Sequence, residues 1–284
     1  MIDGTTRIVA VIGDPIEHTL SPPMHNAAFE SLGMNWTYVA FHVKHDDVGA
    51  TVESIRALNM AGINITVPHK QAVIPFLDQL TSEARAVGAV NTIINRDGHL
   101  IGDNTDIHGI REAIRIGAGL DPCPENVVLL GAGGAARGVA YALTTIHSVK
   151  HVTILNRTAE KAESLAAEFD GETRITGGPL DGTTARNALA DAELVINVTS
   201  LGRGTYADQT PIPDEWDCLH PGITCIDSNY SPPVTRLMDQ VESAGGKAFN
   251  GLDMLVFQGA RSFELWTGVV PPTQVMKTAI GIVA

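Results

Sequence analysis

Short apolar runs alternate with helical patterns in the first third of this 284-residue chain. Arg7–Ile12, Trp36–Val43 and Gly62–Val67 have the length and the Val and Ile content of strands. Between them, residues 24–33 (MHNAAFESLG) and Asp47–Asn59 show helical spacing of apolar residues. Strands that alternate with helices predict a mostly parallel sheet covered by helices.

Turn and cap signals mark the ends of several of these elements. Ser21 is expected to N-cap the first helix, and Gly33 is expected to end it. Two further strands, Ala89–Asn95 and His99–Asp103, flank an Asp97-Gly98 dipeptide that is typical of a tight hairpin turn.

The chain changes character at Gly117–Pro124, a stretch rich in Gly and Pro that we interpret as a junction between domains. Beyond it, alternating strands and helices predict a second parallel sheet. Its strands are expected at Asn126–Leu130, Val152–Leu155, Leu194–Asn197 and Thr224–Asp227, and two C-terminal helices at Met254–Thr267 and Val275–Val283.

Composition favours a globular protein with small-molecule ligands. The length suggests two domains, and hydrophobic residues make up 44% of the chain. With 19 basic and 32 acidic residues, the net charge of −13 should repel nucleic acid and anionic membranes. An anionic ligand must therefore be bound by local donors.

Cysteine usage and the absence of targeting signals indicate a cytoplasmic protein. The three cysteines, Cys123, Cys218 and Cys225, form no close pair, and no Cys/His cluster has zinc spacing, so we expect no metal. The N-terminus lacks the pattern of a signal peptide, and no apolar run approaches the roughly 20 residues that span a bilayer.

A glycine-rich loop carries the first functional signal. Gly131, Gly133 and Ala136 stand as G-x-G-x-x-A directly after a predicted strand and at the start of a predicted helix. This context favours dinucleotide binding over a mere tight turn, because the loop lets backbone approach a pyrophosphate at a helix N-terminus.

The residues at the end of the next strand indicate which dinucleotide, NAD or NADP, the loop binds. NAD-preferring folds usually place an acid there, but this chain reads Asn156-Arg157-Thr158, with Lys161 one turn later. A guanidinium suits a 2′-phosphate, so we expect NADP(H). Alternatively, Thr158 simply N-caps the helix that follows, and both interpretations can hold together.

Three polar residues are candidates for catalysis because we expect them to emerge at the same edge of the first sheet. Lys70 comes after the strand in NITVPHK, Asn91 lies in AVNT, and Asp106 lies in DNTD. Singly, each has an ordinary explanation: a surface lysine, a turn asparagine, and an N-cap for a helix from Ile107. Their convergence on one sheet edge favours a lysine–aspartate pair that moves the proton of a substrate hydroxyl.

Taken together, the motifs resemble the shikimate dehydrogenase family, which includes quinate/shikimate dehydrogenases. The resemblance rests on GDPIEHTLSPPMHNAAF, NITVPHK, GAVNT, GDNTD, GAGGAARG, NRT, INVTSLG and GLDMLVFQGARSFELWTG, and covers essentially the whole chain. It implies reversible NADPH-dependent reduction of 3-dehydroshikimate to shikimate, in aromatic amino-acid biosynthesis. It also implies two domains: an α/β sandwich catalytic domain of residues 1–107 completed by 250–284, and a Rossmann-type NADP-binding domain of residues 108–249.

The resemblance also implies roles for individual residues. Lys70 and Asp106 match the catalytic pair. Substrate contacts are implied for Thr19, Ser21, Asn64, Thr66, Asn91, Tyr230 and Gln258. Cofactor contacts are expected at Gly131, Ala132, Gly133, Gly134, Ala135, Asn156, Arg157, Thr158 and Lys161, and on the nicotinamide side at Thr199, Ser200, Gly251 and Met254.

One position departs from the family pattern. The carboxylate-binding segment is usually Ser-x-Ser-Pro, and here it is Thr19-Leu20-Ser21-Pro22. Threonine keeps the hydroxyl donor. Its added methyl group takes up space beside the substrate ring, where quinate carries an extra hydroxyl, and so affects the selectivity between shikimate and quinate. Four alternative functions remain: a quinate dehydrogenase, an aminoshikimate dehydrogenase, a folate dehydrogenase/cyclohydrolase and a non-enzymatic NADP-binding sensor. A monomer and a homodimer both fit the sequence.

Overall fold

The computed structural model describes residues 2–282, which form two compact units. Unit 1 contains residues 1–109 and 256–284, and unit 2 contains residues 110–255. The sequence-based domain boundaries lie at 107/108 and 249/250, within two and six residues of these divisions. The two units are connected by helices α4 (Asp106–Glu112) and α9 (Leu252–Thr267), each of which contributes residues to both.

Unit 1 is built on a six-stranded sheet in the order β2-β1-β3-β5-β6-β4. Only β5 pairs antiparallel with its neighbours, so the mixed sheet is mostly parallel, as predicted. The strands are β1 (Arg7–Gly13), β2 (Trp36–His42), β3 (Gly62–Ile65), β4 (Gln79–Leu80), β5 (Thr92–Arg96) and β6 (His99–Asp103). The β5–β6 turn has positive φ at Asp97 (52°) and Gly98 (89°), which confirms the predicted tight hairpin.

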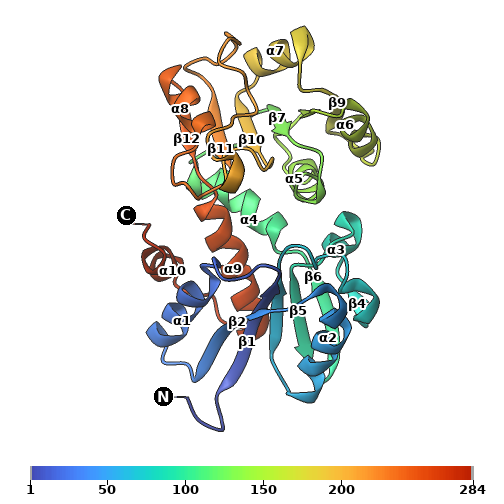
Figure 1. Cartoon of the computed structure of the whole chain (residues 1–284), viewed down its shortest axis with the longest axis vertical. Helices are drawn as coiled ribbons and strands as arrows, with labels where there is room; N and C mark the ends of the chain where they lie inside the picture. The colour runs from blue at the N-terminus through green and yellow to red at the C-terminus, as the bar shows by residue number, and fades with distance from the viewer. Residues whose placement is uncertain (1, 283–284) are drawn as a thin grey trace. The chain divides into compact units, whose positions relative to one another are not determined.

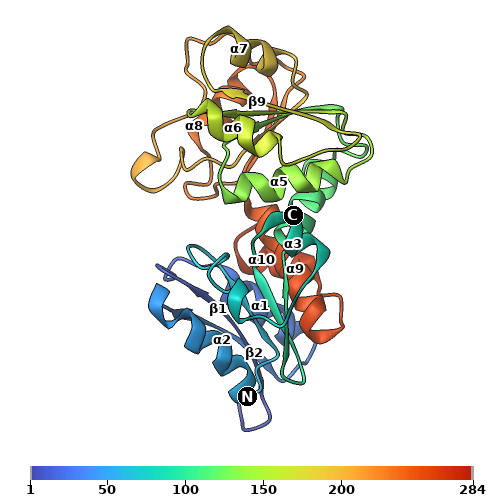
Figure 2. The same cartoon turned by 90° about the vertical axis from the view of Figure 1, so that its right-hand side faces the viewer.

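Helices cover both faces of this sheet (Figure 1). They are α1 (Ser21–Ser31), α2 (Val48–Ala57), α3 (Ser82–Val87), the second part of α9, and α10 (Thr273–Ala279). Strand residues alternate between the two faces, as the pleat requires. Ile12, Ile63 and Ile93 pack with Val52 of α2 on one face, while the Trp266 indole of α9 donates to the carbonyl oxygen of Ile93 at 3.0 Å. Figure 2 shows α2 on one side of the sheet and α9 with α10 on the other.

The start of α1 differs from the prediction. Leu20 is the N-cap residue, with helical dihedrals of φ −91° and ψ −1°, and no side chain caps the helix. Ser21 is therefore the first residue of the helix and not its N-cap. Gly33 has φ of 63° just after the end of the helix, as expected of a glycine that ends it.

Unit 2 contains a parallel six-stranded sheet in the order β12-β11-β10-β7-β8-β9. Read from β7 as the first strand, this is the 3-2-1-4-5-6 order of the Rossmann fold, reversing between β7 and β10. The strands are β7 (Asn126–Leu130), β8 (His151–Asn156), β9 (Arg174–Pro179), β10 (Leu194–Asn197), β11 (Thr224–Asp227) and β12 (Lys247–Phe249).

The helices of unit 2 are α5 (Gly134–Thr144), α6 (Ala159–Ala166), α7 (Gly182–Ala190), α8 (Arg236–Ser243) and the first part of α9. Leu189 of α7 and Val241 of α8 pack on one face of the sheet with Val128 and Val195. The predicted junction at Gly117–Pro124 begins where α4 and a π-helical segment (Ala113–Gly117) end. The predicted last helix is shorter than expected, and its Val283 lies outside the described residues.

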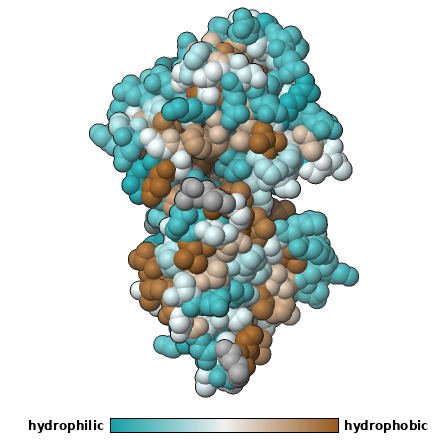
Figure 3. All heavy atoms as spheres, turned by 90° about the vertical axis from the view of Figure 1, so that its left-hand side faces the viewer, coloured by the Kyte–Doolittle hydropathy of each residue, from teal (hydrophilic) through white to brown (hydrophobic). Residues whose placement is uncertain are grey.

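The exposed apolar side chains of unit 1 lie on several different elements. They include Ile8 on β1, Leu32 after α1 and Phe41 on the edge strand β2. Figure 3 shows separate hydrophobic areas among polar ones. In the described part of the chain, residues 2–282, no helix combines the length and the apolar character that crossing a membrane requires.

Candidate active site and cofactor-binding site

The direction of β5 brings polar residues that are distant in sequence to one edge of the unit 1 sheet. Asn64 of β3 lies opposite Thr92 of β5, and Thr92 lies opposite Asp103 of β6. Because β5 runs antiparallel to both neighbours, its first residue lies where β3 and β6 end. Residues that follow β3 and β6 and residues that precede β5 therefore meet at this edge.

Lys70 lies in the segment after β3, and backbone contacts fix it on both sides. The fully buried ring of His69 places Nε2 2.7 Å from the carbonyl oxygen of Val43. The carbonyl oxygen of Lys70 accepts from the N–H of Val90 at 2.8 Å. The backbone is thus anchored, while the Lys70 side chain stays 31% exposed.

The carboxylate of Asp106 bridges Lys70 and Asn91. Its Oδ2 accepts from Lys70 Nζ at 2.7 Å, and its Oδ1 accepts from Asn91 Nδ2 at 2.9 Å. Helix α4 begins at Asp106 itself, so Asp106 is the first residue of this helix and not, as in the alternative explanation, the N-cap of a helix from Ile107. The Asp106 side chain is 24% exposed, so the pair is partly shielded from solvent without being closed off. This geometry suits proton exchange with a ligand hydroxyl.

Asn91 and Gln258 extend the group from β5 to helix α9. The Asn91 amide nitrogen also lies 3.0 Å from Thr105 Oγ1 and 3.4 Å from Gln258 Oε1, while its Oδ1 accepts from the N–H of Thr105 at 2.7 Å. Four predicted residues, Lys70, Asn91, Asp106 and Gln258, are therefore brought together in unit 1.

Behind this group lies a buried hydrogen-bond network that the sequence did not predict. Asn64 Nδ2 lies 3.0 Å from both Thr92 Oγ1 and Ser262 Oγ, and Asn64 Oδ1 accepts from the Tyr38 hydroxyl at 2.7 Å. Ser262 is 0% exposed and Tyr38 is 1% exposed. The only sequence signal is that Ser262 falls one helical turn after Gln258, on the same face of α9.

Three further residues of unit 1 were expected to contact substrate: Thr19 and Ser21 at the carboxylate, and Thr66 at a ring hydroxyl. Ser21 is 7% exposed, and its backbone N–H donates to Thr19 Oγ1 at 3.3 Å. Thr66 is half-buried, and its N–H donates to the carbonyl oxygen of Ile12 at 2.9 Å.

In unit 2, the glycine loop leaves its backbone accessible. Gly131 has φ of 112°, which favours glycine, and it is buried against Val198 and Thr199. Gly133 and Gly134 are exposed, and no atom lies within 4 Å of where a Cβ would stand. Ala132 is half-buried and Ala135 is exposed, while the 0% exposed Ala136 packs into the core as the small third residue of the motif.

The end of β8 presents two cations. Arg157 and Lys161 are exposed, and within residues 2–282 neither forms an ion pair. Asn156 Nδ2 donates to the carbonyl oxygen of Thr158 at 2.9 Å, which shapes the turn. Thr158 is the N-cap residue of α6, but its side chain makes no cap hydrogen bond, so the alternative capping role is wrong for its hydroxyl.

A buried aspartate organises the loops after β10 and β11. Asp227 Oδ1 accepts from Asn197 Nδ2 and from the N–H of Asn229, both at 3.0 Å, and Oδ2 accepts from Thr235 Oγ1 at 2.7 Å. Burial raises the pKa of Asp227 above its usual range. Asn197 Oδ1 in turn accepts from the N–H of Thr199 at 3.0 Å.

The remaining predicted residues of unit 2 follow these loops. Ser200 is exposed, and Tyr230 and Met254 are half-buried; burial raises the pKa of the Tyr230 hydroxyl. A Cβ at Gly251 would lie 2.2 Å from the carbonyl oxygen of Ser228, so this position requires glycine. Sequence reasoning missed Asp227, because a carboxylate at the end of an apolar strand does not reveal how many donors surround it.

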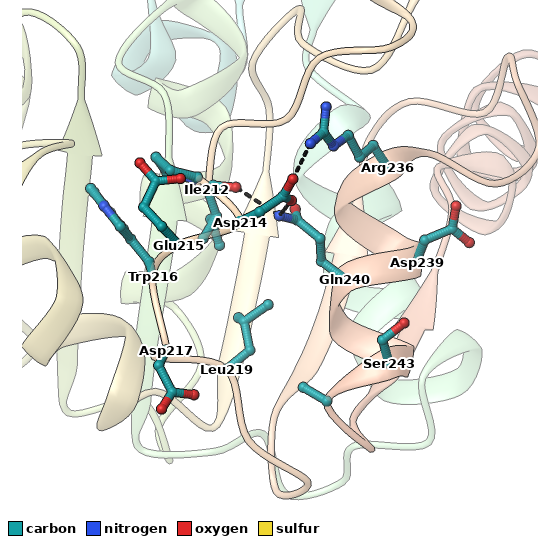
Figure 4. A pocket seen from close by; sticks show the side chains of 12 residues that line it. Ile212, Asp214, Glu215, Trp216, Asp217, Leu219, Arg236, Asp239, Gln240 and Ser243 are labelled. Atoms are coloured by element: carbon teal, nitrogen blue, oxygen red, sulfur yellow. Dashed lines mark hydrogen bonds and ion pairs between the residues drawn. The ribbon is translucent and has the colours of Figure 1, made fainter.

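A groove elsewhere on unit 2 is lined by no residue of the predicted sites. It has a volume of about 510 Å³ and lies between the loop before β11 and helix α8. Arg236 forms an ion pair with Asp214 there, and the carboxylates of Glu215, Asp217 and Asp239 point in different directions (Figure 4). These groups do not converge on one ligand, and the groove is not part of the candidate site.

Family models match three segments of the chain. Residues 11–93 match the shikimate dehydrogenase substrate binding domain, residues 120–204 match shikimate / quinate 5-dehydrogenase, and residues 251–280 match the shikimate 5′-dehydrogenase C-terminal domain. These segments include the glycine loop, Lys70, Asn91 and Gln258.

Individual relatives match nearly the full length. Shikimate dehydrogenase (NADP(+)) from Desulforamulus reducens is 42% identical over 281 residues, covering 98% of this chain and 96% of the relative. Shikimate 5-dehydrogenase from Listeria monocytogenes, solved in complex with shikimate and NAD, has a TM-score of 0.92 and 34% identity, covering 98% of each chain. The Thermus thermophilus enzyme, solved with NADP(H) and shikimate, has a TM-score of 0.85 and 35% identity, covering 96% of this chain and 98% of the other. Fold, motifs and relatives agree, and the chain belongs to the shikimate dehydrogenase family.

Proposed function

We propose that this protein is an NADP-dependent oxidoreductase that interconverts shikimate and 3-dehydroshikimate, within the shikimate pathway of aromatic amino-acid biosynthesis. The relative from Desulforamulus reducens, which matches this chain over 98% of its length, is named for the same activity and cofactor. The observation that carries the proposal is the group formed by Lys70, Asp106 and Asn91, with Lys70 Nζ 2.7 Å from Asp106 Oδ2.

Lys70 and Asp106 perform the proton chemistry. When shikimate is oxidised, its reacting hydroxyl must lose a proton as the carbon loses a hydride. Lys70 in its neutral form accepts that proton at Nζ, and in the reverse direction its ammonium donates the proton to the ketone oxygen. Asp106 orients Lys70 Nζ and accepts a hydrogen bond from a substrate hydroxyl. NADP⁺, when bound, supplies the hydride acceptor.

Hydroxyl and amide groups of unit 1 bind the rest of the substrate. Thr19 and Ser21 donate to its carboxylate, which has to be bound by local donors in a protein of net charge −13. The ring hydroxyls are bound by Asn64, Thr66, Asn91 and Gln258, and the contact expected for Tyr230 stays a prediction. Because these donors are neutral, we expect a modest affinity for the substrate, and the loss of any one donor should lower that affinity.

The residues of unit 2 fit an NADP molecule. Gly131, Ala132, Gly133, Gly134 and Ala135 offer an accessible backbone at the N-terminus of α5, where a pyrophosphate is favoured. Arg157 and Lys161, which form no ion pair within the described residues, bind the 2′-phosphate with Asn156 and Thr158. Thr199, Ser200, Gly251 and Met254 line the nicotinamide side.

The two compact units divide these tasks. Unit 1 is the catalytic, substrate-binding domain predicted at residues 1–107 and 250–284, and unit 2 is the NADP-binding domain predicted at residues 108–249. The cytoplasmic location and the choice between monomer and homodimer stay predictions.

An absorbance assay of NADPH formation tests the proposed activity. The purified protein is mixed with NADP⁺ and shikimate, and in parallel with quinate, aminoshikimate or methylenetetrahydrofolate; NAD⁺ replaces NADP⁺ in a second series. We expect the highest kcat/KM for shikimate with NADP⁺. A higher kcat/KM for quinate would reassign the substrate, and NADP binding without turnover of any of these compounds would favour a sensor.

A further inference from the structure

Ser262 joins four separate segments of unit 1 through one hydroxyl group. Its Oγ lies 3.0 Å from Asn64 Nδ2, 2.8 Å from Thr92 Oγ1 and 3.1 Å from Thr105 Oγ1. It also lies 3.1 Å from the carbonyl oxygen of Gln258, one turn earlier on α9. Ser262 is 0% exposed, so water cannot replace any of these contacts without entering the core.

The donors and acceptors of the network fix which way Asn64 points. Asn64 Oδ1 accepts from the Tyr38 hydroxyl at 2.7 Å, so Nδ2 must face Ser262 and Thr92. Nδ2 carries two hydrogens, and the hydroxyl oxygens of Ser262 and Thr92 are two of its acceptors. Nδ2 also lies 3.1 Å from the carbonyl oxygen of Asn91. Removing the Ser262 hydroxyl leaves Nδ2 with two acceptors, that carbonyl and Thr92 Oγ1, so the amide orientation loses one of its three constraints.

A second path leads from Ser262 to the catalytic pair. Thr105 Oγ1, which contacts Ser262, accepts from Asn91 Nδ2 at 3.0 Å, and the same Asn91 nitrogen donates to Asp106 Oδ1 at 2.9 Å. Asp106 then accepts from Lys70 through its other oxygen. Ser262 is therefore three contacts away from Asp106 and touches neither Asp106 nor Lys70.

We propose that Ser262 is a positioning residue for the reaction. Its hydroxyl fixes the amide orientations of Asn64 and Asn91, and through Asn91 it fixes the Asp106 carboxylate against Lys70. The inference rests on the proposed dehydrogenase activity, because its kinetic test uses that activity. The inference assigns a role in turnover to a buried residue of α9 that does not touch Lys70 or Asp106.

The test compares Ser262→Ala with Thr267→Val. Thr267 lies on the same helix and also donates to the carbonyl oxygen four residues earlier, that of Phe263 at 2.8 Å, but it has no contact with the network. Ser262→Ala should lower kcat about tenfold, with the circular dichroism spectrum and NADP affinity unchanged, whereas Thr267→Val should stay within twofold of the parent. Ser262→Thr, which keeps a hydroxyl, should recover most of the lost kcat.

A double-mutant cycle separates positioning from general destabilisation. In a Lys70→Ala background, adding Ser262→Ala should lower the residual kcat by less than threefold, because both changes affect one catalytic unit. The proposal is overturned by a Ser262→Ala variant that keeps its kcat within twofold, or by losses that multiply in the double variant.

A crystal structure of Ser262→Ala tests the inference independently of any substrate. The Asn64 and Asn91 amides should rotate or show alternative orientations, and the contact between Asp106 Oδ1 and Asn91 Nδ2 should lengthen from 2.9 Å. Unchanged amides and an unchanged contact would overturn the inference even if the natural substrate were quinate. An inactive parent protein, by contrast, would count against the proposed function alone.

Discussion

Lys70 and Asp106 are 36 positions apart in the sequence, and their side chains meet at 2.7 Å at one edge of the unit 1 sheet. The contact forms because β3 and β6 end at the same edge on either side of the antiparallel β5. Lys70 lies in the segment that follows β3 and Asp106 in the segment that follows β6, so the position of the pair follows from strand direction and register.

Replacing Lys70 by alanine should abolish most of the turnover. We expect kcat to fall roughly 100- to 10,000-fold, the usual contribution of a positioned acid–base group, with a KM for shikimate close to that of the parent. Steady-state kinetics with shikimate and NADP⁺ measure both constants. Lys44→Ala, at an exposed lysine, is the control. Near-normal turnover of Lys70→Ala would remove Lys70 from the mechanism.

Thr19→Val should affect binding more than turnover. Valine keeps the shape of the side chain and removes the hydroxyl proposed to donate to the substrate carboxylate. A hydrogen bond to a charged group contributes about 1.5–3 kcal/mol, so KM for shikimate should rise about tenfold or more while kcat changes little. Thr278→Val, whose exposed hydroxyl bonds only within α10, is the matched control. An unchanged KM would contradict the proposed role of Thr19.

Arg157→Ala should change the cofactor preference. The loss of a charge-assisted contact to the 2′-phosphate should raise KM for NADP⁺ about tenfold to a hundredfold and leave KM for NAD⁺ nearly unchanged. Initial rates with each cofactor at saturating shikimate give both values. Arg174→Ala, at an exposed arginine at the start of β9, should alter neither. Equal losses with both cofactors would mean that Arg157 does not contact the 2′-phosphate.

His25 should make unit 1 sensitive to acid. The His25 ring is fully buried and stacks on Tyr38 with 4.3 Å between ring centroids; burial lowers its pKa from 6.5 to about 3. Between these values the unfolded chain binds a proton that the folded chain does not, so the free energy of unfolding falls as pH falls, by about 1.4 kcal/mol per pH unit.

His25→Phe keeps an aromatic ring beside Tyr38 and removes this titration. Urea unfolding at pH 7 and pH 4.5 should show that the variant loses about 2–3 kcal/mol less on acidification than the parent. His151→Phe, at an exposed histidine of β8, should lose as much as the parent. Identical acid sensitivity of His25→Phe and the parent would refute the assignment of this effect to His25.

The features that could be predicted from the sequence are those with a local signal, such as the spacing of apolar residues or a short motif. The strand patterns at Arg7, Asn126, Leu194 and Thr224 begin where the observed strands begin, and the glycine loop follows β7 as its motif requires. The two-residue strand β4 escaped prediction because two residues show no periodicity, and it exists only because β6 pairs with it.

What the sequence could not predict is how side chains pair across the sheet. Ser21 was expected to cap its own helix, whereas it is the first residue of that helix and no side chain caps it. The Tyr38 hydroxyl bonds Asn64 Oδ1, a partner 26 positions away that only folding brings near. Ser262 has the appearance of a small core residue of an amphipathic helix, and its function depends on Asn64, which lies 198 positions away. Long-range polar contacts of this kind leave no local pattern.

Unit 1 consists of an N-terminal and a C-terminal segment of the chain, and this affects the order in which its parts are synthesised on the ribosome. Residues 256–284 complete this unit, and they include Gln258 and Ser262. On the ribosome the continuous unit 2 is synthesised in full while Asn64 and Thr92 still lack their α9 partner. The nascent chain therefore acquires this network only after Gln258 and Ser262 have been synthesised, and a chain truncated after Leu255 would lack it.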